Sequence, residues 1–322
     1  MQSEIRDVAL ELGYLDAKPA TGHPFDVWRK RLSSIPLGQH LSFAHDPVAV
    51  SGWPLEEITI WAAVSATPPI EGWPDDCGEI GAYYMRSEER SNRYKAWKEK
   101  VVELGYEIAS DFTLPDRAAA IRAGLGVHGL NGLLITPGYG SFVGINLLLI
   151  RAAPPPDARG PEFDMSPGCG DCGICIPTCP SGAITENGVD TVICLRTYMN
   201  WPEYMPEEDY SKMDKRIVGC DICQHVCPKN ALLKWEQPPT AVIECMKLEK
   251  LLTDPGIDDM FNITKLKHTS TKDVKRQAIF ATANTGRKDL LPLILPLADS
   301  DDEWLRKAAR WAIRQLQSVS EG

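Results

Sequence analysis

The spacing of the cysteines constrains what this chain can fold into more than any other feature of its sequence. The segment CGDCGICIPTCP, residues 169–180, has the pattern C-x2-C-x2-C-x3-C-P. This pattern binds 4Fe-4S clusters, and in two-cluster proteins its fourth cysteine is a ligand of the other cluster. A second run, GCDICQHVCP at residues 219–228, has three cysteines and the proline, but Ile217 stands where its first cysteine would be.

Cys194 lies between the two runs and is the remaining cysteine nearby, so we predict that it replaces the missing ligand. One cluster is then expected on Cys169, Cys172, Cys175 and Cys227. The other is expected on Cys179, Cys194, Cys220 and Cys223. The alternative is zinc, because paired C-x2-C units also occur in zinc ribbons, but the added C-x3-C-P is awkward for a tetrahedral ion. Cys77 and Cys245 lie outside both runs, and we expect them to be buried thiols.

Charge and hydropathy narrow the environment of the chain. Its formal net charge of −10 argues against nonspecific adhesion to nucleic acid or anionic membranes, although a local basic patch could still bind RNA. The N-terminal MQSEIRDVALELGYLD does not resemble a secretory signal, and no later stretch has the ~18 uninterrupted apolar residues of a membrane span. We therefore expect a cytoplasmic protein without membrane contact. Because that compartment is reducing, its cysteines are expected to bind metal and not to form disulfides.

At 322 residues the chain exceeds what one hydrophobic core usually serves, so we predict three domains. Helical stripes and strand-like runs alternate in residues 1–155, which indicates an α/β or α+β domain; the runs are ITIWAAVS at 58–65, LLIT at 133–136 and INLLLIR at 145–151. One stripe contains Ile5, Val8, Ala9 and Leu12, and another contains Tyr94, Trp97, Val101 and Leu104. A proline-rich linker opens the cysteine-dense domain, residues 156–236, for which a two-cluster ferredoxin-like fold is expected.

Residues 237–322 are predicted to be helical. The segment 288–317 resembles a helical-repeat hairpin of the HEAT type, in which Ser300 is an N-cap with Glu303 three residues later. A stripe follows at Trp304, Ala308, Ala312 and Leu316. Such a hairpin needs a neighbour to cover its apolar face, so we expect it to dock on the rest of the chain.

A glycine-rich stretch, RAGLGVHGLNGLLITPGYGSF at 122–142, precedes the cysteines. It has neither the P-loop pattern nor a clean G-x-G-x-x-G. Its glycines would let the backbone approach a flat, bulky ligand, or they form ordinary turns. Because a bare electron carrier needs little besides its cluster segment, we expect the clusters to supply a reaction in the first domain.

These features together resemble a known superfamily. RAGLG at 122–126, Asn131, the GS pair at 140–141 and the two cysteine runs are similar to the cobalamin- and iron–sulfur-dependent reductases. That superfamily includes the epoxyqueuosine reductases and the reductive dehalogenases. KRQAIFATANTG at 275–286 and the hairpin after it resemble the end of epoxyqueuosine reductases, which dehalogenases lack. The nearer resemblance is therefore to the epoxyqueuosine reductases.

The resemblance implies a nitroreductase-like domain that holds base-off cobalamin above the nearer cluster, fed by an external low-potential electron donor. It implies reduction of epoxyqueuosine in tRNA, with Asp111 as the proton donor; the competing interpretation is that Asp111 caps a helix start, where Asp116 would serve as well. The expected cobalamin contacts are His128, Gly129, Asn131, Tyr139, Ser141, Leu195, Arg196, Thr197 and Gln224.

Several positions depart from the relatives' patterns. Val127 to Gly132 replace a tryptophan and a Gly-Lys-Asn-Thr sequence, and Leu195 to Thr197 replace Ile-Ser-Tyr. The loop NGLLITPGYG looks more like its dehalogenase counterpart, yet Gly144 stands where dehalogenases have an arginine. A corrinoid reductase of a small organic substrate and a noncatalytic iron–sulfur protein therefore remain alternatives. Tyr83 and Tyr84 are second-choice proton donors or core residues, and His128 is expected to be a neutral loop histidine sooner than a cobalt ligand.

A basic segment near the C-terminus could contact the anticodon stem-loop of tRNA. Within residues 265–288 seven basic residues face one acid, Asp273. The seven are Lys265, Lys267, Lys272, Lys275, Arg276, Arg287 and Lys288. Such a cluster could follow a phosphate backbone, or it could be an ordinary solvated helix face.

Overall fold

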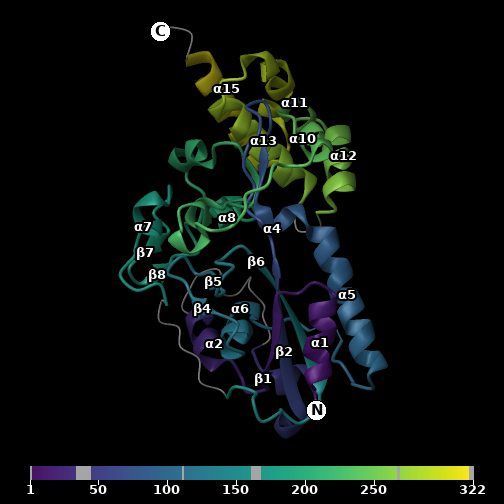
Figure 1. The fold of residues 1–322 in the computed structure, drawn as a ribbon. Coiled ribbons are helices and arrows are strands. Elements are labelled where there is room, and N and C mark those ends of the chain that lie inside the picture. The colour runs from purple at the N-terminus through teal and green to yellow at the C-terminus, as the bar shows by residue number, and fades with distance from the viewer. Residues whose placement is uncertain (1, 34–44, 111, 161–167, 267–268, 319–322) are drawn as a thin grey trace.

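The computed structural model describes residues 2–33, 45–110, 112–160, 168–266 and 269–318. It has a mixed α/β architecture in which a sheet with helices on both faces lies at one end and a group of helices lies at the other (Figure 1). The cysteine-rich segment lies between them. Among the described residues, no helix has the length and apolar character needed to cross a membrane.

The sheet contains three antiparallel strands in the order β1-β2-β6. They are β1 (Asp16–Thr21), β2 (Ile58–Ala66) and β6 (Val143–Arg151). β2 is the central strand, and all but its last residue are buried, as expected when helices cover both faces of a strand. The predictions of strands at 58–65 and 145–151 are therefore confirmed.

Alternate residues of β2 enter two different cores. Ile60 and Ala62 pack against α6 (Asp116–Arg122), which places three buried alanines on that face of the sheet. Trp61 and Ala63 pack on the opposite face against α1 (Ser3–Glu11) and α5 (Ser87–Glu103). The predicted helical stripes supply this second core through residues such as Ile5 and Trp97. Leu104 differs: it follows the last residue of α5 and is 45% exposed.

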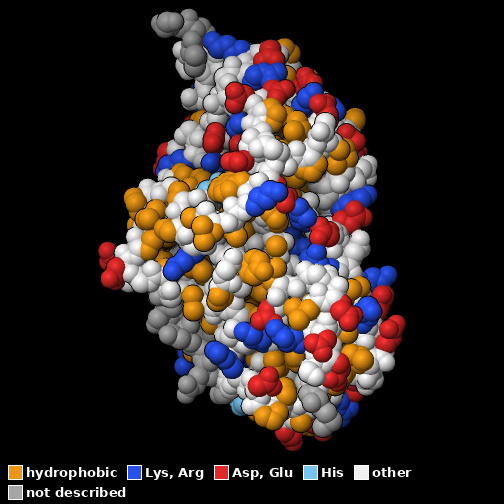
Figure 2. All heavy atoms as spheres, viewed as in Figure 1, with side chains coloured by type: hydrophobic (Ala, Val, Ile, Leu, Met, Phe, Trp, Pro, Cys, Tyr) orange, Lys and Arg blue, Asp and Glu red, His pale blue; other side chains and the backbone are white. Residues whose placement is uncertain are grey.

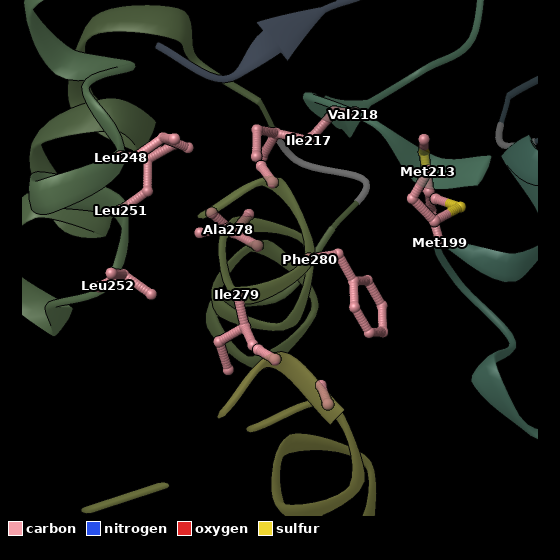
Figure 3. Packing of buried hydrophobic residues seen from close by; sticks show 14 of the residues in the cluster. Met199, Met213, Ile217, Val218, Leu248, Leu251, Leu252, Ala278, Ile279 and Phe280 are labelled. Carbon is pink, nitrogen blue, oxygen red and sulfur yellow. The ribbon is translucent and has the colours of Figure 1, made fainter. Parts of the chain in front are cut away.

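The C-terminal helices and the cysteine-rich segment share one core. Its centre is α13 (Thr271–Asn284), whose Ala278, Ile279 and Phe280 lie between leucines of α11 on one side and two methionines of the cysteine-rich segment on the other (Figure 3). Residues from the N-terminal half join this core through β3 (Glu79–Ile80), which pairs in parallel with β9 (Arg216–Val218). The expectation that the helical tail docks on the rest of the chain is confirmed.

The last helix, α15 (Glu303–Ser318), begins differently from its prediction. The backbone N–H groups of Trp304 and Leu305 donate to the carboxylate of Asp302, so Asp302 provides the cap and not Ser300. The Ser300 hydroxyl accepts from the Asp302 N–H, in the turn that precedes the helix. The predicted apolar stripe is buried from Ala308 onward, whereas Trp304 is half-buried.

The other α-helices and strands of the described residues are short. They are α2 (Asp26–Ser33), α3 (Pro47–Ser51), α4 (Ala82–Met85), β4 (Val127–His128), β5 (Leu134–Ile135), α7 (Cys175–Thr178), β7 (Ile184–Thr185), β8 (Gly188–Val189), α8 (Leu195–Tyr198), α9 (Ile222–His225), α10 (Thr240–Cys245), α11 (Leu248–Leu251), α12 (Asp254–Thr264) and α14 (Leu291–Ile294). The predicted strand at 133–136 is present as β5, which pairs with β4.

Candidate functional site

All ten cysteine thiols are free; eight of them gather in two sets, and Cys77 and Cys245 are buried apart from these sets, as predicted. Burial raises the pKa of the Cys175 thiol, and the neighbouring thiolates whose charge raises it further are Cys169, Cys172 and Cys227. These are the four predicted for one cluster. Cys172 is exposed, and Figure 2 shows hydrophobic side chains gathered on the surface of this segment around α7.

The second set is more deeply buried. Burial raises the pKa of the Cys223 thiol, and nearby thiolates add to it, among them Cys220 and Cys194. Burial likewise raises the pKa of Cys194, with Cys179 as its thiolate neighbour. Cys175 also acts on Cys223, so the two sets adjoin. The thiols of each predicted set thus lie near enough to affect one another's pKa, and the assignment of each thiol to a cluster stays a prediction.

Ile217 explains why the second run lacks a cysteine at its start. The side chain is 1% exposed and points from β9 into the shared core, where it fills the space beside Gly78. A side chain at this position is therefore used for packing in the core. Cys194, at the N-cap of α8, joins the second set in its place, and the Thr197 N–H donates to its carbonyl oxygen at 2.8 Å.

A cavity of about 340 Å³ opens between the sheet and the buried thiol set. Its apolar walls include Leu134 from β5 and two residues of β6, Val143 and Ile145. Cys220 forms part of the opposite wall. The remaining lining residues are polar or aromatic side chains and one glycine: Thr67, Tyr83, Tyr84, Asp116, Arg117, Ser141, Arg196, Gly219, Asp221 and Gln224, together with Leu133. A predicted cluster ligand therefore lies directly in the wall of a cavity.

A hydrogen-bond network ties the glycine-rich loop to the second cysteine run at this cavity. The Asn230 side chain accepts from the Ser141 N–H at 2.8 Å and donates to the Gln224 carbonyl oxygen at 2.7 Å. The Ser141 hydroxyl in turn donates to the Gln224 side chain at 3.2 Å. Gly140 has a φ of 58°, and a side chain there would collide with the Asn230 amide, so glycine is required.

We expect Asn230→Ala to lower the stability of the protein by about 1–3 kcal/mol, because it leaves the buried Ser141 N–H without a partner. The melting temperature of the cluster-loaded protein should fall by several degrees. The control is Asn187→Ala, which removes an exposed side chain. Equal melting temperatures for the two variants would show that the network contributes nothing to stability.

Arg196, which stands where the relatives' pattern has a serine, is hydrogen-bonded to another residue that lines this cavity. Its guanidinium donates to the Tyr84 hydroxyl at 2.7 Å and to the Asn200 side chain at 3.0 Å. The Tyr83 and Tyr84 rings meet edge to face, 5.2 Å between centroids. Both tyrosines line the cavity; Tyr84 also packs against the shared core, as expected of a core residue, whereas Tyr83 is 40% exposed.

The predicted cofactor residues separate into two groups. Ser141, Arg196 and Gln224 line the cavity. The others are not among its lining residues: Leu195 is buried in the shared core, Tyr139 is 41% exposed, and His128, Gly129, Asn131 and Thr197 lie in or beside the loops that carry the lining. The Leu130 N–H, within the glycine-rich loop, donates to the Cys169 sulfur at 3.4 Å.

The acid assigned to proton donation, Asp111, lies outside the described residues. Asp116 lines the cavity at the start of α6, where its carboxylate accepts from the Arg117 N–H at 2.7 Å, and Pro115 and not Asp116 occupies the N-cap position. Sequence reasoning missed Thr67, Arg117 and Asp221 in the lining. For Asp221 a signal existed, because it lies between two cluster cysteines in GCDIC.

The proposed basic patch for RNA is largely neutralised. Lys272 pairs with Asp302 at 3.0 Å, Lys275 pairs with Asp254, and Arg287 pairs with Asp289. Arg276 is buried and donates to the Met199 carbonyl oxygen at 2.6 Å, so it cannot face solvent. The acids come from outside the segment 265–288, which is why counting charges within it was misleading. Lys267 lies outside the described residues.

Comparison with known proteins finds a matching domain family and relatives similar over most of the chain. Residues 168–230 match the family described as "4Fe-4S double cluster binding domain". The epoxyqueuosine reductase of Staphylococcus aureus is 27% identical over 98% of this chain and 89% of its own length, and that of Bacillus anthracis is 31% identical over 73% of this chain and 63% of its own.

Solved structures share the fold. An epoxyqueuosine reductase with a tRNA-Tyr epoxyqueuosine-modified stem loop superposes with a TM-score of 0.75 at 23% identity, over 98% of this chain and 90% of that one. The Bacillus subtilis enzyme, whose aspartate-bearing catalytic loop is swung out of the active site, gives 0.76 at 24% identity over the same shares. With its double-cluster segment and its similarity over nearly the full chain, this protein resembles the epoxyqueuosine reductases in sequence and in fold.

Proposed function

We propose that this protein reduces epoxyqueuosine in tRNA to queuosine. The reaction takes two electrons and two protons, breaks both carbon–oxygen bonds of the epoxide, forms a carbon–carbon double bond and releases the oxygen as water. The observation that carries the proposal is the position of Cys220 in the wall of a cavity, in a chain whose relatives are epoxyqueuosine reductases. Electrons from a cluster can reach a substrate there without crossing solvent.

The two thiol sets give a direction to electron flow. The set that contains the exposed Cys172 is the entry point for an external low-potential donor, since electrons must enter where a cluster lies nearest the surface. The second set adjoins the first through Cys175 and Cys223, and it reaches the cavity through Cys220. The clusters therefore serve as a path from the surface to the cavity.

The residues of the cavity fit the cobalamin that the resemblance implies. Leu134, Val143 and Ile145 offer an apolar wall to a macrocycle, and Ser141 and Gln224 offer polar groups to its amide side chains. The buried Thr136 hydroxyl, in the loop beside Gly140, has no hydrogen-bond partner among the described residues.

We infer that the cobalamin is held by the loop with Ser141, by Arg196 and by Gln224, and that the other predicted contacts in these loops support them. The supporting contacts are His128, Gly129, Asn131, Tyr139, Leu195 and Thr197. When bound, cobalamin supplies a cobalt centre that the clusters can reduce and that acts on the carbon–oxygen bond. The chain's own part is to supply protons and exclude water. We assign proton donation to Asp111, which must stay protonated near neutral pH to do so.

The finer structural predictions belong to the same proposal. We assign the cobalamin-binding part to residues 1–155 with a nitroreductase-like fold, the ferredoxin-like part to 156–236 and the HEAT-like tail to 237–322. A cytoplasmic location follows from a tRNA substrate. Of the basic residues proposed to contact the anticodon stem-loop, Lys265 remains the best candidate, because it is exposed and has no ion-pair partner among the described residues.

The test is anaerobic reconstitution of the full chain with iron, sulfide and cobalamin, followed by reaction with a reductant and an anticodon stem-loop that contains epoxyqueuosine. We expect nucleoside mass spectrometry to show the loss of one oxygen atom, and no loss when cobalamin is omitted. A loaded, reduced protein that leaves the nucleoside intact would contradict the proposed function. A small halogenated substrate tested in parallel covers the dehalogenase-like alternative.

A further inference from the structure

A second cavity, of about 290 Å³, adjoins the reaction cavity, and Tyr83 lines both of them. Three parts of the chain meet in it: the first turns of α5, Asn146 of β6, and Lys265 at the end of α12. Its lining is mostly polar. The reaction proposed above uses none of these side chains, and Lys265 is named there only as a candidate RNA contact, so the cavity itself has no assigned role.

Arg90 is the unusual residue of this cavity. Its guanidinium carbon lies 3.8 Å from the centroid of the Tyr83 ring, and its N–H donates to the Tyr83 carbonyl oxygen. Arg86 and Arg93, on either side along the helix, both pair with Glu89. Arg90 makes no ion pair within the described part of the chain. Arg90 is half-buried, and this burial lowers its pKa.

A glycine in β6, Gly144, leaves the space that the Arg90 side chain occupies. A Cβ atom at Gly144 would lie 2.7 Å from Arg90 Cδ, so any larger residue would displace the arginine. Arg90 is therefore fixed by Tyr83 on one side and by Gly144 on the other. Its hydrogen bonds in the described part of the chain are to Tyr83, and its side chain lines the second cavity, where a ligand could reach it.

The other polar groups of the cavity suit an anion. Lys265 adds a second cation without an ion-pair partner among the described residues, against one acid, Glu88. Ser91 and Asn92 add neutral hydrogen-bond donors. A fixed arginine with neutral donors around it is the usual environment of a bound phosphate oxygen.

We propose that the second cavity binds a phosphodiester group of the substrate RNA, adjacent to the nucleotide whose base enters the reaction cavity. The shared wall at Tyr83 fits a polynucleotide, in which one sugar separates a base from its phosphate. This inference rests on the proposed function. The competing source of a phosphodiester is the nucleotide tail of cobalamin, and the experiment separates the two.

The experiment measures binding of the reconstituted full chain to a fluorescent anticodon stem-loop by anisotropy over a series of salt concentrations. We expect Arg90→Gln to weaken binding about tenfold and to reduce the salt slope by about 0.7–0.9, as for one lost phosphate contact. Lys95→Gln removes an exposed charge from the same helix and is the matched control, with affinity and slope unchanged.

Stem-loops with one neutral methylphosphonate linkage each locate the contact. One linkage beside the substrate nucleotide should weaken binding to the wild type about tenfold and have no effect on Arg90→Gln. Gly144→Ala, which keeps the charge but displaces Arg90, should lose the same sensitivity. Cluster absorbance and circular dichroism check that each variant is folded.

The outcomes are distinct. If the wild type binds RNA and Arg90→Gln binds it equally at every salt concentration, this inference is wrong and the proposed function stands. If Arg90→Gln loses cobalamin binding while its RNA salt slope is unchanged, the phosphodiester belongs to the cofactor and the inference is again wrong. If the wild type shows no salt-dependent RNA binding, both the inference and the tRNA substrate fail.

Discussion

Asp111→Asn is expected to lower turnover of epoxyqueuosine-containing RNA by a factor of about 10² to 10⁴, the contribution of a positioned proton donor. The epoxide oxygen leaves as water only when protons reach it, and asparagine cannot release one. Along the chain Asp111 stands between Ala109, whose N–H donates to the Leu149 carbonyl oxygen, and Asp116 in the cavity lining. Single-turnover rates measure the effect. Iron content and cobalamin binding should match the wild type.

The matched control for this prediction is Asp116→Asn. Asp116 is the acid of α6 that lines the cavity, but its carboxylate already accepts from the Arg117 N–H at the start of the helix. We therefore expect a loss of only a few-fold, far below the ~10² assigned to a proton donor. The reverse result, with Asp111→Asn active and Asp116→Asn inactive, would transfer the role of proton donor to Asp116.

The strands with apolar runs, β2 and β6, were predictable, and the polar edge strand β1 was not. The apolar runs at 58–65 and 145–151 indicate strands by themselves, because a strand covered on both sides needs hydrophobic residues throughout. The residues of β1, DAKPAT, contain a proline and two charges and give no such signal. They form a strand because β2 pairs with them, with Pro19 opposite Trp61 at the edge of the sheet, where a missing N–H is tolerated.

The cysteine sets could be read from spacing, because a ligand motif fixes its own local geometry. The cavity could not, because its walls come from segments far apart in the chain, such as Thr67, Val143 and Arg196. Leu195 shows the same limit: it adjoins a cluster ligand in sequence, yet its side chain enters the shared core. The glycine at 144, where the dehalogenase pattern has an arginine, gave no hint that Arg90 of α5 fills the space above it.

Cys194→Ala is expected to remove one of the two clusters, so that iron falls from about eight to about four atoms per chain. Cys194 belongs to the buried thiol set, and that set alone reaches the cavity through Cys220. Loss of its cluster breaks the electron path, so reduction of the substrate should fall below detection even with excess reductant. Iron analysis, electron paramagnetic resonance of the reduced protein and the single-turnover assay measure these effects.

Cys245→Ala is the matched control, because this buried thiol donates only to the Val242 carbonyl oxygen and belongs to neither set. It should keep the iron of both clusters and its activity. Full iron in Cys194→Ala would show that another residue completes the second cluster.

The double variant Cys194→Ala with Ile217→Cys tests the geometry directly. It restores the complete ferredoxin spacing in the sequence, C-x2-C-x2-C-x3-C, from residue 217 onward. We expect no recovery of iron, because the residue 217 side chain is buried in the shared core, where it fills the space beside Gly78. Recovery would mean that β9 can rotate to present a ligand, and the second cluster would then be that of an ordinary ferredoxin. If iron is not recovered, residue 217 cannot serve as a cluster ligand in this fold. Its side chain is needed for core packing where β9 pairs with β3, and Cys194 supplies the fourth ligand instead.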